Sequence, residues 1–245
     1  MTDAIVGRPA ATADSAVRPD LMLPAAPKLG TRRQLSAEVE AQIREMIMTG
    51  RLRAGEHIRT DKLAEELGIS QTPVREGLQA LRGQGFLTLE PRKGFRVLQL
   101  RQSDIDDIFI AQAHLAAELA RRATSRLSDD QVDELDRLDS ELDAAVAARN
   151  GDAVQALDWA FHRMINLTAD SPKLKLLLSV ALFYVPRTLF RTNLVYPPAA
   201  GRKEIIAAIR DRDEARAAAA MHRHIQDYGK ALQEYLDAGG ALTSD

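Results

Sequence analysis

One segment of the sequence restricts the fold more than any other: residues 60–97, TDKLAEELGISQTPVREGLQALRGQGFLTLEPRKGFRV. A short helix-forming stretch ends at Gly68, which can take the left-handed conformation of a tight turn. A second helix then begins at Ser70 and places apolar residues on one face, namely Val74, Leu78 and Leu81. Two short strands follow, joined by the turn PRKG. This order of elements predicts a helix–turn–helix unit with a β-hairpin wing.

The side chains at the start of the second helix suit the edges of DNA bases. Glutamine can pair bidentately with adenine and arginine with guanine, while threonine can contact bases or phosphate. A basic hairpin tip beside the helix suits a phosphate backbone or a minor groove. The expected DNA contacts are Ser70, Gln71, Thr72 and Arg75 on the helix, with Arg92, Lys93 and Arg96 on the wing. The alternative is a small helical subdomain whose basic hairpin serves solubility.

The charge distribution agrees with a polyanion contact in this part of the chain. The 245 residues carry 33 Lys and Arg against 35 Asp and Glu, yet residues 28–100 hold 13 basic and 9 acidic groups. Aromatic residues make up 4%, which argues against a stacking surface for single-stranded nucleic acid. The chain has no cysteine, so disulfides, cysteine-based zinc sites and thiol nucleophiles are excluded.

The remaining sequence predicts a mainly α protein with two domains. Residues 1–30 are rich in Ala and Pro and predict a disordered or loosely docked tail. Residues 31–100 form the winged helix, with Ser36 as the expected N-cap of its first helix and RLRAGEHI as a loop. Residues 101–240 predict an all-helical antiparallel bundle without strands. Its expected helices lie near 104–126, 128–149, 151–169, 172–194, 202–211 and 213–237.

Neither a membrane span nor a secretory signal is recognisable in the sequence. No apolar run approaches the length that crosses a bilayer. The N-terminus carries an acid at position 3 and lacks a basic region before an apolar stretch. We therefore expect a cytoplasmic protein without a membrane partner.

Three residues of the predicted bundle could bind a divalent metal such as zinc. Asp158 and His162 are four residues apart, so they project from the same helix face one turn apart. His224 lies on the last helix and could reach into the bundle. One carboxylate and two imidazoles form a ligand set typical of zinc and related ions. The alternative is a salt bridge and two partly exposed histidines without a metal.

The motifs also resemble those of the GntR family of bacterial transcriptional regulators, FadR subfamily, over residues 35–237. The family pattern G-x-[LI]-x-P-G-x-x-L appears as GRLRAGEHI, with Ala54 in place of Pro. The pattern L-A-x-x-L-G-[VI]-S-R-T-P-V-R-E-A-L appears as LAEELGISQTPVREGL. Gln71 replaces the usual Arg, which predicts a different operator sequence. Gly77 replaces the usual Ala, at a helix-propensity cost of about 1 kcal/mol.

The resemblance implies a homodimer that binds a palindromic operator and an all-helical FCD effector domain that binds a small carboxylate. It further implies that Asp158, His162 and His224 are metal ligands, whereas Arg202 stands where the family has another histidine. Arg202 then either holds an acidic effector directly or leaves a three-ligand metal site with open positions. The candidate effector-binding residues are Gln112, Arg187 and Arg202. At Gln112 and Ala116 the family often has Arg and Glu.

We therefore expect a ligand-responsive regulator. Most regulators of this kind are repressors that the effector releases from DNA, and we expect the same here. The altered positions 112, 116 and 202 keep open a DNA-binding adaptor with a vestigial, unresponsive pocket. A metal-dependent hydrolase or lyase is not expected, because no convincing general base accompanies the three candidate ligands.

Overall fold

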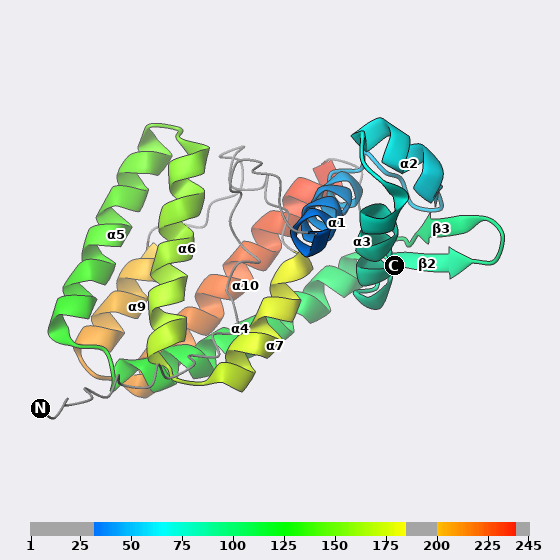
Figure 1. The fold of residues 1–245 in the computed structure, drawn as a ribbon. Coiled ribbons are helices and arrows are strands. Elements are labelled where there is room, and N and C mark those ends of the chain that lie inside the picture. Colours follow the sequence, from blue (N-terminus) through cyan, green and yellow to red (C-terminus); the bar gives the residue numbers. More distant parts are fainter. Residues whose placement is uncertain (1–31, 185–199, 239–245) are drawn as a thin grey trace, which may run out of the picture.

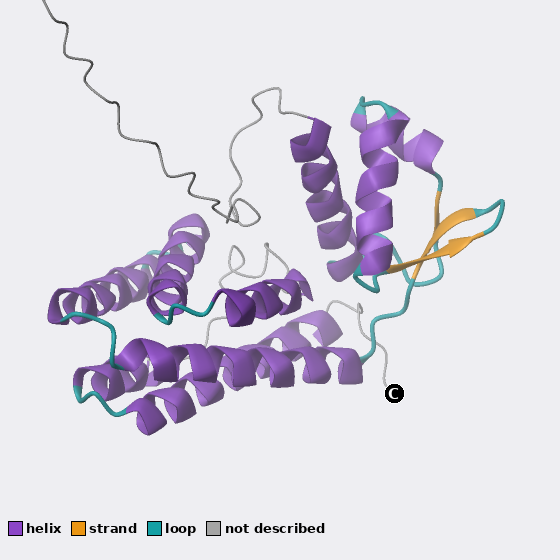
Figure 2. Cartoon of the chain, turned by 60° about the horizontal axis from the view of Figure 1, so that its bottom comes forward, coloured by secondary structure: helices purple, strands orange, loops and turns teal. Residues whose placement is uncertain are grey.

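A computed structural model describes residues 32–184 and 200–238 of the chain, while residues 1–31, 185–199 and 239–245 lie outside the described part. The described residues form two parts. An N-terminal head, residues 32–100, carries three helices and a small sheet. A helical body begins at residue 101 and carries all the remaining helices (Figures 1 and 2).

The head is a winged helix–turn–helix, as the sequence predicts. Its helices are α1 (Arg32–Met48), α2 (Thr60–Leu67) and α3 (Gln71–Gly83). Gly68 ends α2 with a positive φ of 65°, which confirms the left-handed turn between α2 and α3. The side chains of Val74, Leu78 and Leu81 on α3 are buried without measurable exposure. Burial of this one face fixes which side of α3 is left to solvent.

Gly77 lets α1 and α3 approach each other closely. A Cβ atom at this position would lie 3.1 Å from the backbone nitrogen of Glu40 and 3.1 Å from the carbonyl oxygen of Ser36. Both neighbours are backbone atoms of α1, which cannot move aside as a flexible side chain can. The propensity cost of Gly77 is therefore accompanied by a close helix contact that alanine would crowd.

The wing is a three-stranded antiparallel sheet with the order β1-β3-β2. The strands are β1 (His57–Ile58), β2 (Leu87–Glu90) and β3 (Gly94–Val97). Strand β3 pairs with both neighbours, so that Arg96 lies opposite His57 on one side and Thr88 on the other. Gly94 has a φ of 93°, and a Cβ there would lie 2.9 Å from the Ile58 carbonyl oxygen. Only glycine fits this crossing point.

The body is an antiparallel arrangement of helices around the long pair α4 and α10. Helix α9 packs on α10 and α5, and α5 packs on α6. The capping box that the sequence predicts at Ser128 and Gln131 is present at the start of α5. The elements are α4 (Gln102–Thr124), α5 (Asp129–Ala147), α6 (Gly151–Thr168), α7 (Pro172–Ala181), the 3-10 turn η2 (Leu182–Tyr184), α9 (Ala200–Arg210) and α10 (Glu214–Ala238).

A continuous apolar core joins the head to the body. The cluster that fills the head also contains Phe109 of α4 and Leu232 of α10. Tyr184 strengthens this contact: its ring stacks on Phe86 with centroids 4.6 Å apart, and its hydroxyl donates a hydrogen bond to the Gln84 carbonyl oxygen. Head and body are therefore packed on each other at the C-terminal end of α3.

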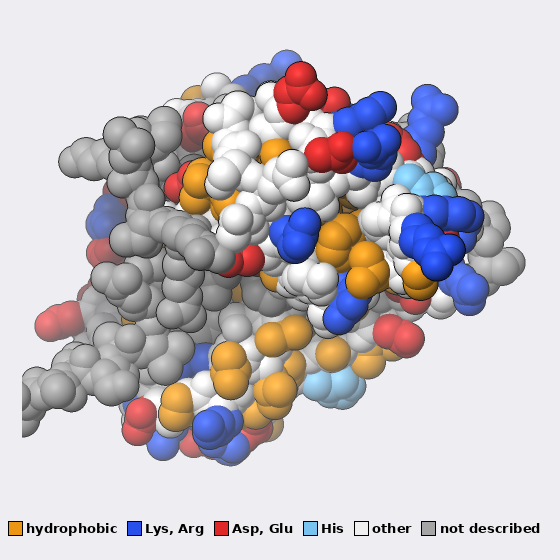
Figure 3. All heavy atoms as spheres, turned by 45° about the vertical axis from the view of Figure 1, so that its right-hand side comes forward, with side chains coloured by type: hydrophobic (Ala, Val, Ile, Leu, Met, Phe, Trp, Pro, Cys, Tyr) orange, Lys and Arg blue, Asp and Glu red, His pale blue; other side chains and the backbone are white. Residues whose placement is uncertain are grey.

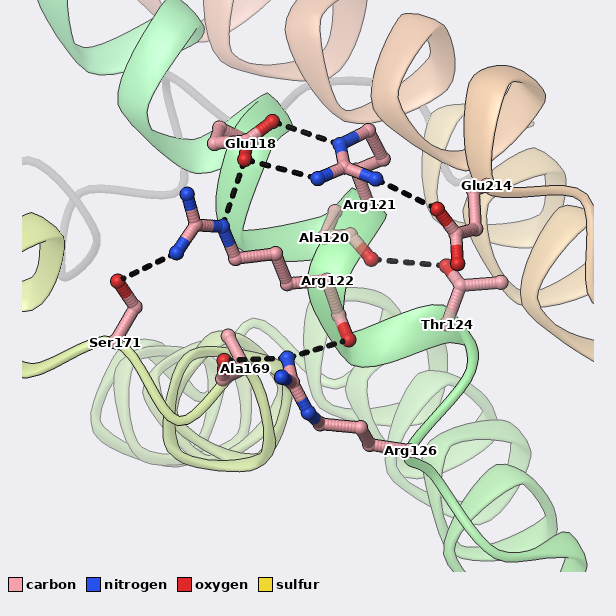
Figure 4. A network of polar contacts seen from close by, with 9 residues as sticks. All are labelled: Glu118, Ala120, Arg121, Arg122, Thr124, Arg126, Ala169, Ser171 and Glu214. Atoms are coloured by element: carbon pink, nitrogen blue, oxygen red, sulfur yellow. Dashed lines mark hydrogen bonds and ion pairs between the residues drawn. The ribbon is translucent and has the colours of Figure 1, made fainter.

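Charged side chains tie the end of α4 to its neighbours (Figure 4). Glu118 accepts hydrogen bonds from Arg121 and Arg122, and these two guanidinium groups lower the pKa of the Glu118 carboxyl to about 2. Arg121 also donates to Glu214 at the start of α10, at 2.6 Å. Arg122 donates to Ser171, which precedes α7, at 3.2 Å. The network thus links the end of α4 to the starts of α7 and α10.

Three expectations about elements are corrected. Ser36 is not an N-cap, because α1 already begins at Arg32 and the Ser36 hydroxyl donates to Glu76 of α3. The segment RLRAGEHI is not entirely loop, since pairing with β3 makes His57–Ile58 a strand. The helix expected over 172–194 ends at Ala181 and continues as η2, and its remainder lies outside the described residues.

None of the described helices combines the length and the apolar character needed to cross a bilayer.

Candidate nucleic-acid interface and metal centre

The N-terminal end of α3 is open to solvent. Ser70, Gln71, Thr72 and Arg75 are all exposed, whereas Val74 on the same turn is buried. Pro73 fits the first helical turn, where a missing N–H costs nothing. The first backbone N–H groups of a helix have no partner within the helix, and Ser70 makes no side-chain capping bond to them. This end of α3 therefore presents base-reading side chains together with donors suited to a phosphate.

The three cationic residues predicted for the wing are also exposed, but two of them are paired with an acid. Glu90, the last residue of β2, accepts a contact from Arg96 Nη1 at 3.4 Å and from Lys93 Nζ at 3.8 Å. His57 Nε2 lies 2.9 Å from the same carboxylate. The hydrogen bond from His57, together with the neighbouring cations, lowers the pKa of Glu90. Sequence reasoning did not single out Glu90.

The three predicted metal ligands come together in the body. One ligand atom each from Asp158, His162 and His224 lies within 4.8 Å of the other two. The rings of His162 and His224 stack with centroids 5.4 Å apart, and His162 Nε2 is 3.8 Å from Asp158 Oδ1. Helix α6 supplies the first two residues one turn apart, and α10 supplies the third. The four-residue spacing of Asp158 and His162 therefore places both side chains beside His224, and the three residues form one cluster.

His224 is the most informative member of this cluster. Its side chain is 1% exposed, and among the described residues neither of its ring nitrogens has a hydrogen-bond partner. Burial holds its pKa well below the usual value, and His162 and Arg202 act in the same direction. Burial likewise lowers the pKa of His162. Both imidazoles are therefore neutral at pH 7, which is the form that binds a metal ion.

Two residues that sequence reasoning missed support the cluster. The Tyr228 hydroxyl donates a hydrogen bond of 2.8 Å to Asp158 Oδ1 and so orients the carboxylate. Gly201, at the start of α9, faces His224: a Cβ there would lie 3.0 Å from His224 Nδ1. Tyr228 could have been found, because it follows His224 by four residues on one helix face. Nothing in the local sequence marks Gly201.

Arg202 is buried next to this cluster and binds two acids of α5. Its Nε donates to Asp139 at 2.5 Å and its Nη2 donates to Asp143 at 2.7 Å. Its positive charge still contributes to the lowered pKa values of both histidines. Arg202 therefore joins α9 to α5 beside the cluster, at a position where a guanidinium cannot serve as a metal ligand.

The remaining effector-binding candidates have different outcomes. Gln112 is buried on α4, and its Nε2 donates to the Ala181 carbonyl oxygen at 3.1 Å, which links α4 to the end of α7. Arg187 lies outside the described residues. The assignment of Gln112, Arg187 and Arg202 to an effector stays a prediction.

The donor set fits a divalent metal. Two neutral imidazoles, one of them buried without a partner among the described residues, face a carboxylate that Tyr228 holds in place. Nitrogen and oxygen ligands of this kind suit zinc and similar ions.

A winged helix–turn–helix joined to a helical bundle defines a class of DNA-binding regulators. Comparison with known families makes this specific. Residues 35–97 match the model for bacterial regulatory proteins of the gntR family, and residues 107–227 match the FCD domain model. The chain belongs to the GntR family and carries an FCD domain. It is a DNA-binding transcriptional regulator and not an enzyme.

Several known regulators are similar over most of the chain. The Nta operon transcriptional regulator of Aminobacter aminovorans is 29% identical, over 81% of this chain and 93% of its own. The transcriptional repressor GlaR of Escherichia coli is 28% identical, over 73% of this chain and 87% of its own. The solved structure of E. coli McbR/YncC covers 82% of this chain and 98% of its own, with a TM-score of 0.62 at 22% identity. That structure supports the fold alone.

Proposed function

We propose that this protein is a ligand-responsive repressor whose operator binding is modulated by a small organic acid bound in the helical body. The observation that carries the proposal is His224, a neutral and buried imidazole whose ring nitrogens have no partner among the described residues. Leaving buried polar atoms unsatisfied is costly, so such a group points to a ligand that completes it.

For DNA, the proposal assigns base reading to the start of α3. Gln71 and Arg75 approach base edges in the major groove, and Ser70 and Thr72 contact the neighbouring phosphate or bases. Arg92, Lys93 and Arg96 of the wing contact the flanking backbone. Because duplex operator DNA is the partner, we place the protein in the cytoplasm.

The proposed homodimer would bury an apolar face of the body. Ile110 of α4 and Leu176, Leu177 and Val180 of α7 have large exposed side chains, with 49–56% of each accessible. The two helices pack on each other, and Figure 3 displays hydrophobic side chains gathered over the lower part of the molecule. A second copy of this chain is the proposed occupant, because a twofold axis would present two heads to a palindromic site.

The effector site would be the cluster of Asp158, His162 and His224. A divalent ion held by these residues would supply positive charge and open coordination positions for carboxylate oxygens. Tyr228 keeps the Asp158 carboxylate in one orientation, while burial keeps both imidazoles unprotonated. Arg202 lies near the site, but its guanidinium is bound to Asp139 and Asp143. In this proposal the positive charge that attracts a carboxylate therefore comes from the ion.

Response to the ligand would reach the DNA through the packed contact between body and head. The short η2 turn connects two contacts: Gln112 of α4 binds Ala181 at the end of α7, and Tyr184, the last residue of η2, contacts the end of α3. An effector that favours one arrangement of this contact changes operator affinity, and operator DNA must change effector affinity by the same factor.

Two measurements test the proposal. Elemental analysis of the purified protein reports whether a divalent metal is bound. A thermal-shift screen with small mono- and dicarboxylates should then find a stabilising ligand, by about 2.7 kcal/mol at about a hundredfold excess over Kd. The same ligand should release duplex operator DNA. A protein that ignores every acid and retains its DNA is the adaptor with a vestigial pocket, the alternative that the substituted positions 112, 116 and 202 keep open.

A further inference from the structure

The wing gathers its charges around one carboxylate. Glu90 receives contacts from three separate places: His57 on β1, Lys93 in the turn and Arg96 on β3. These contacts span 2.9–3.8 Å, and the Glu90 side chain retains 27% of its accessible surface. Figure 3 displays basic side chains gathered at this end of the molecule next to a histidine.

Strand register places these groups on one face of the sheet. Arg96 of β3 is paired with His57 of β1 and with Thr88 of β2, so the three side chains lie on the same face of the sheet. Glu90 follows Thr88 by two residues and projects from that same face. The carboxylate therefore lies diagonally opposite Arg96 because of the register and not through a chance side-chain rotamer.

We propose that Glu90 competes with DNA phosphates for the wing cations and thereby sets how tightly the protein holds duplex DNA. In the free protein the carboxylate occupies the position next to Lys93 and Arg96 that a phosphate would take in the complex. A bound phosphate has to share these cations with Glu90 or displace it. The inference rests on the proposed DNA contacts of the wing.

The competition has two measurable consequences. Removal of the negative charge should tighten binding to any duplex, because backbone contacts carry no sequence information. Two exposed ion pairs are weak, so the expected gain is about three- to tenfold. The cations freed from Glu90 would neutralise phosphate more completely, so the slope of log affinity against log salt should steepen by about one unit.

The full-length Glu90→Gln variant tests this with a fluorescent duplex of arbitrary sequence, titrated by anisotropy at several salt concentrations. Glu38→Gln is the matched control, because Glu38 is an exposed acid on α1 and its loss changes the net charge equally. We expect tighter binding and a steeper salt slope for Glu90→Gln alone. Equal behaviour of the two variants, or weaker binding by Glu90→Gln, would overturn the inference.

A second comparison identifies which cations are released. In a Lys93→Gln/Arg96→Gln background, the additional Glu90→Gln change should give no gain, because the groups it frees are gone. A gain that persists there overturns the role assigned to Glu90. If the Lys93→Gln/Arg96→Gln protein binds duplex as tightly as the wild type does, the proposed wing contact itself fails. If the Lys93→Gln/Arg96→Gln protein binds duplex more weakly than the wild type, the wing contact stands. If in addition the single Glu90→Gln variant binds no more tightly than the wild type, only the Glu90 inference falls.

Discussion

The head and the body place their functional polar side chains in opposite environments. At the start of α3, Gln71 and Arg75 are exposed and stand above a buried apolar face. In the body, Asp158 and His224 are buried, and His224 has no hydrogen-bond partner among the described residues. An exposed reading surface suits a partner as large as duplex DNA, whereas a buried polar cluster suits an ion or a small molecule.

The largest effect is expected from His224→Ala, which tests whether the buried cluster of the body binds an ion. Loss of a ligand should cost more than the roughly 10- to 100-fold that loss of a supporting residue costs, so we expect the Zn²⁺ affinity to fall by more than about 100-fold. Competition with a chromophoric chelator measures this. His222→Ala is the control, since His222 is partly exposed and contacts the His114 ring instead. Unchanged Zn²⁺ affinity in His224→Ala would move the ligand site elsewhere.

On the exposed side, Arg75→Ala should weaken operator binding by about 1–3 kcal/mol, the amount typical of a bidentate base contact. Arg82→Ala, at the other end of α3 and also exposed, should leave binding nearly unchanged. Both affinities are measured at one fixed salt concentration, with circular dichroism to confirm the fold. Equal losses for the two variants would indicate a general charge effect and not base reading.

The Gly77→Ala variant tests the close packing of α3 on α1. Crowding against two backbone atoms of α1 costs about 1–3 kcal/mol, and the ~1 kcal/mol of helix propensity that alanine adds offsets part of it. We therefore expect a net destabilisation of up to about 2 kcal/mol. Gly83→Ala is the matched control on the same helix, because a Cβ at Gly83 meets no atom within 4 Å. Urea denaturation measures both. A stabilised Gly77→Ala protein would contradict the close contact.

The smallest effect is expected from pH. Burial lowers the folded-state pKa of His162 and His224 below 6.5, so below that pH the unfolded chain binds more protons than the folded one. The stability of the metal-free protein should therefore fall as pH decreases from about 7.5 to about 5.5. Thermal unfolding with chelator present measures this, and His224→Asn should reduce the slope. Glu118 does not interfere, because its contribution is lost only as pH falls from 4.5 towards about 2.

Much of the head could be predicted from the sequence because its signals are local. The glycine turn at Gly68, the apolar face of α3 and the exposed start of that helix all follow from residues close together in the chain. The strand at His57–Ile58 was missed, because two residues have no strand pattern of their own and only pairing with β3 defines them. Glu90 was missed for the same reason, since its partners lie on three segments.

The body was predictable in outline and less so in its contacts. The four-residue spacing of Asp158 and His162 fixed one side of the cluster, and an inward-facing His224 completed it. The supporting residue Tyr228 lies 70 residues from the Asp158 that it binds. Arg202 could be recognised as a substitution for a ligand, yet its hydrogen bonds to Asp139 and Asp143 depend on how α9 packs against α5.

The sequence by itself determined the order and type of the elements and the chemistry of the side chains, because hydrophobic period, turn residues and helix spacing act over a few neighbouring positions. The tertiary structure decided which polar groups meet. It gave Glu90 three cationic or imidazole neighbours, placed Gly77 against a backbone and buried His224 beside Asp158. Each of these depends on contacts between distant segments, and the packing of whole helices and strands, not the local sequence, sets those distances.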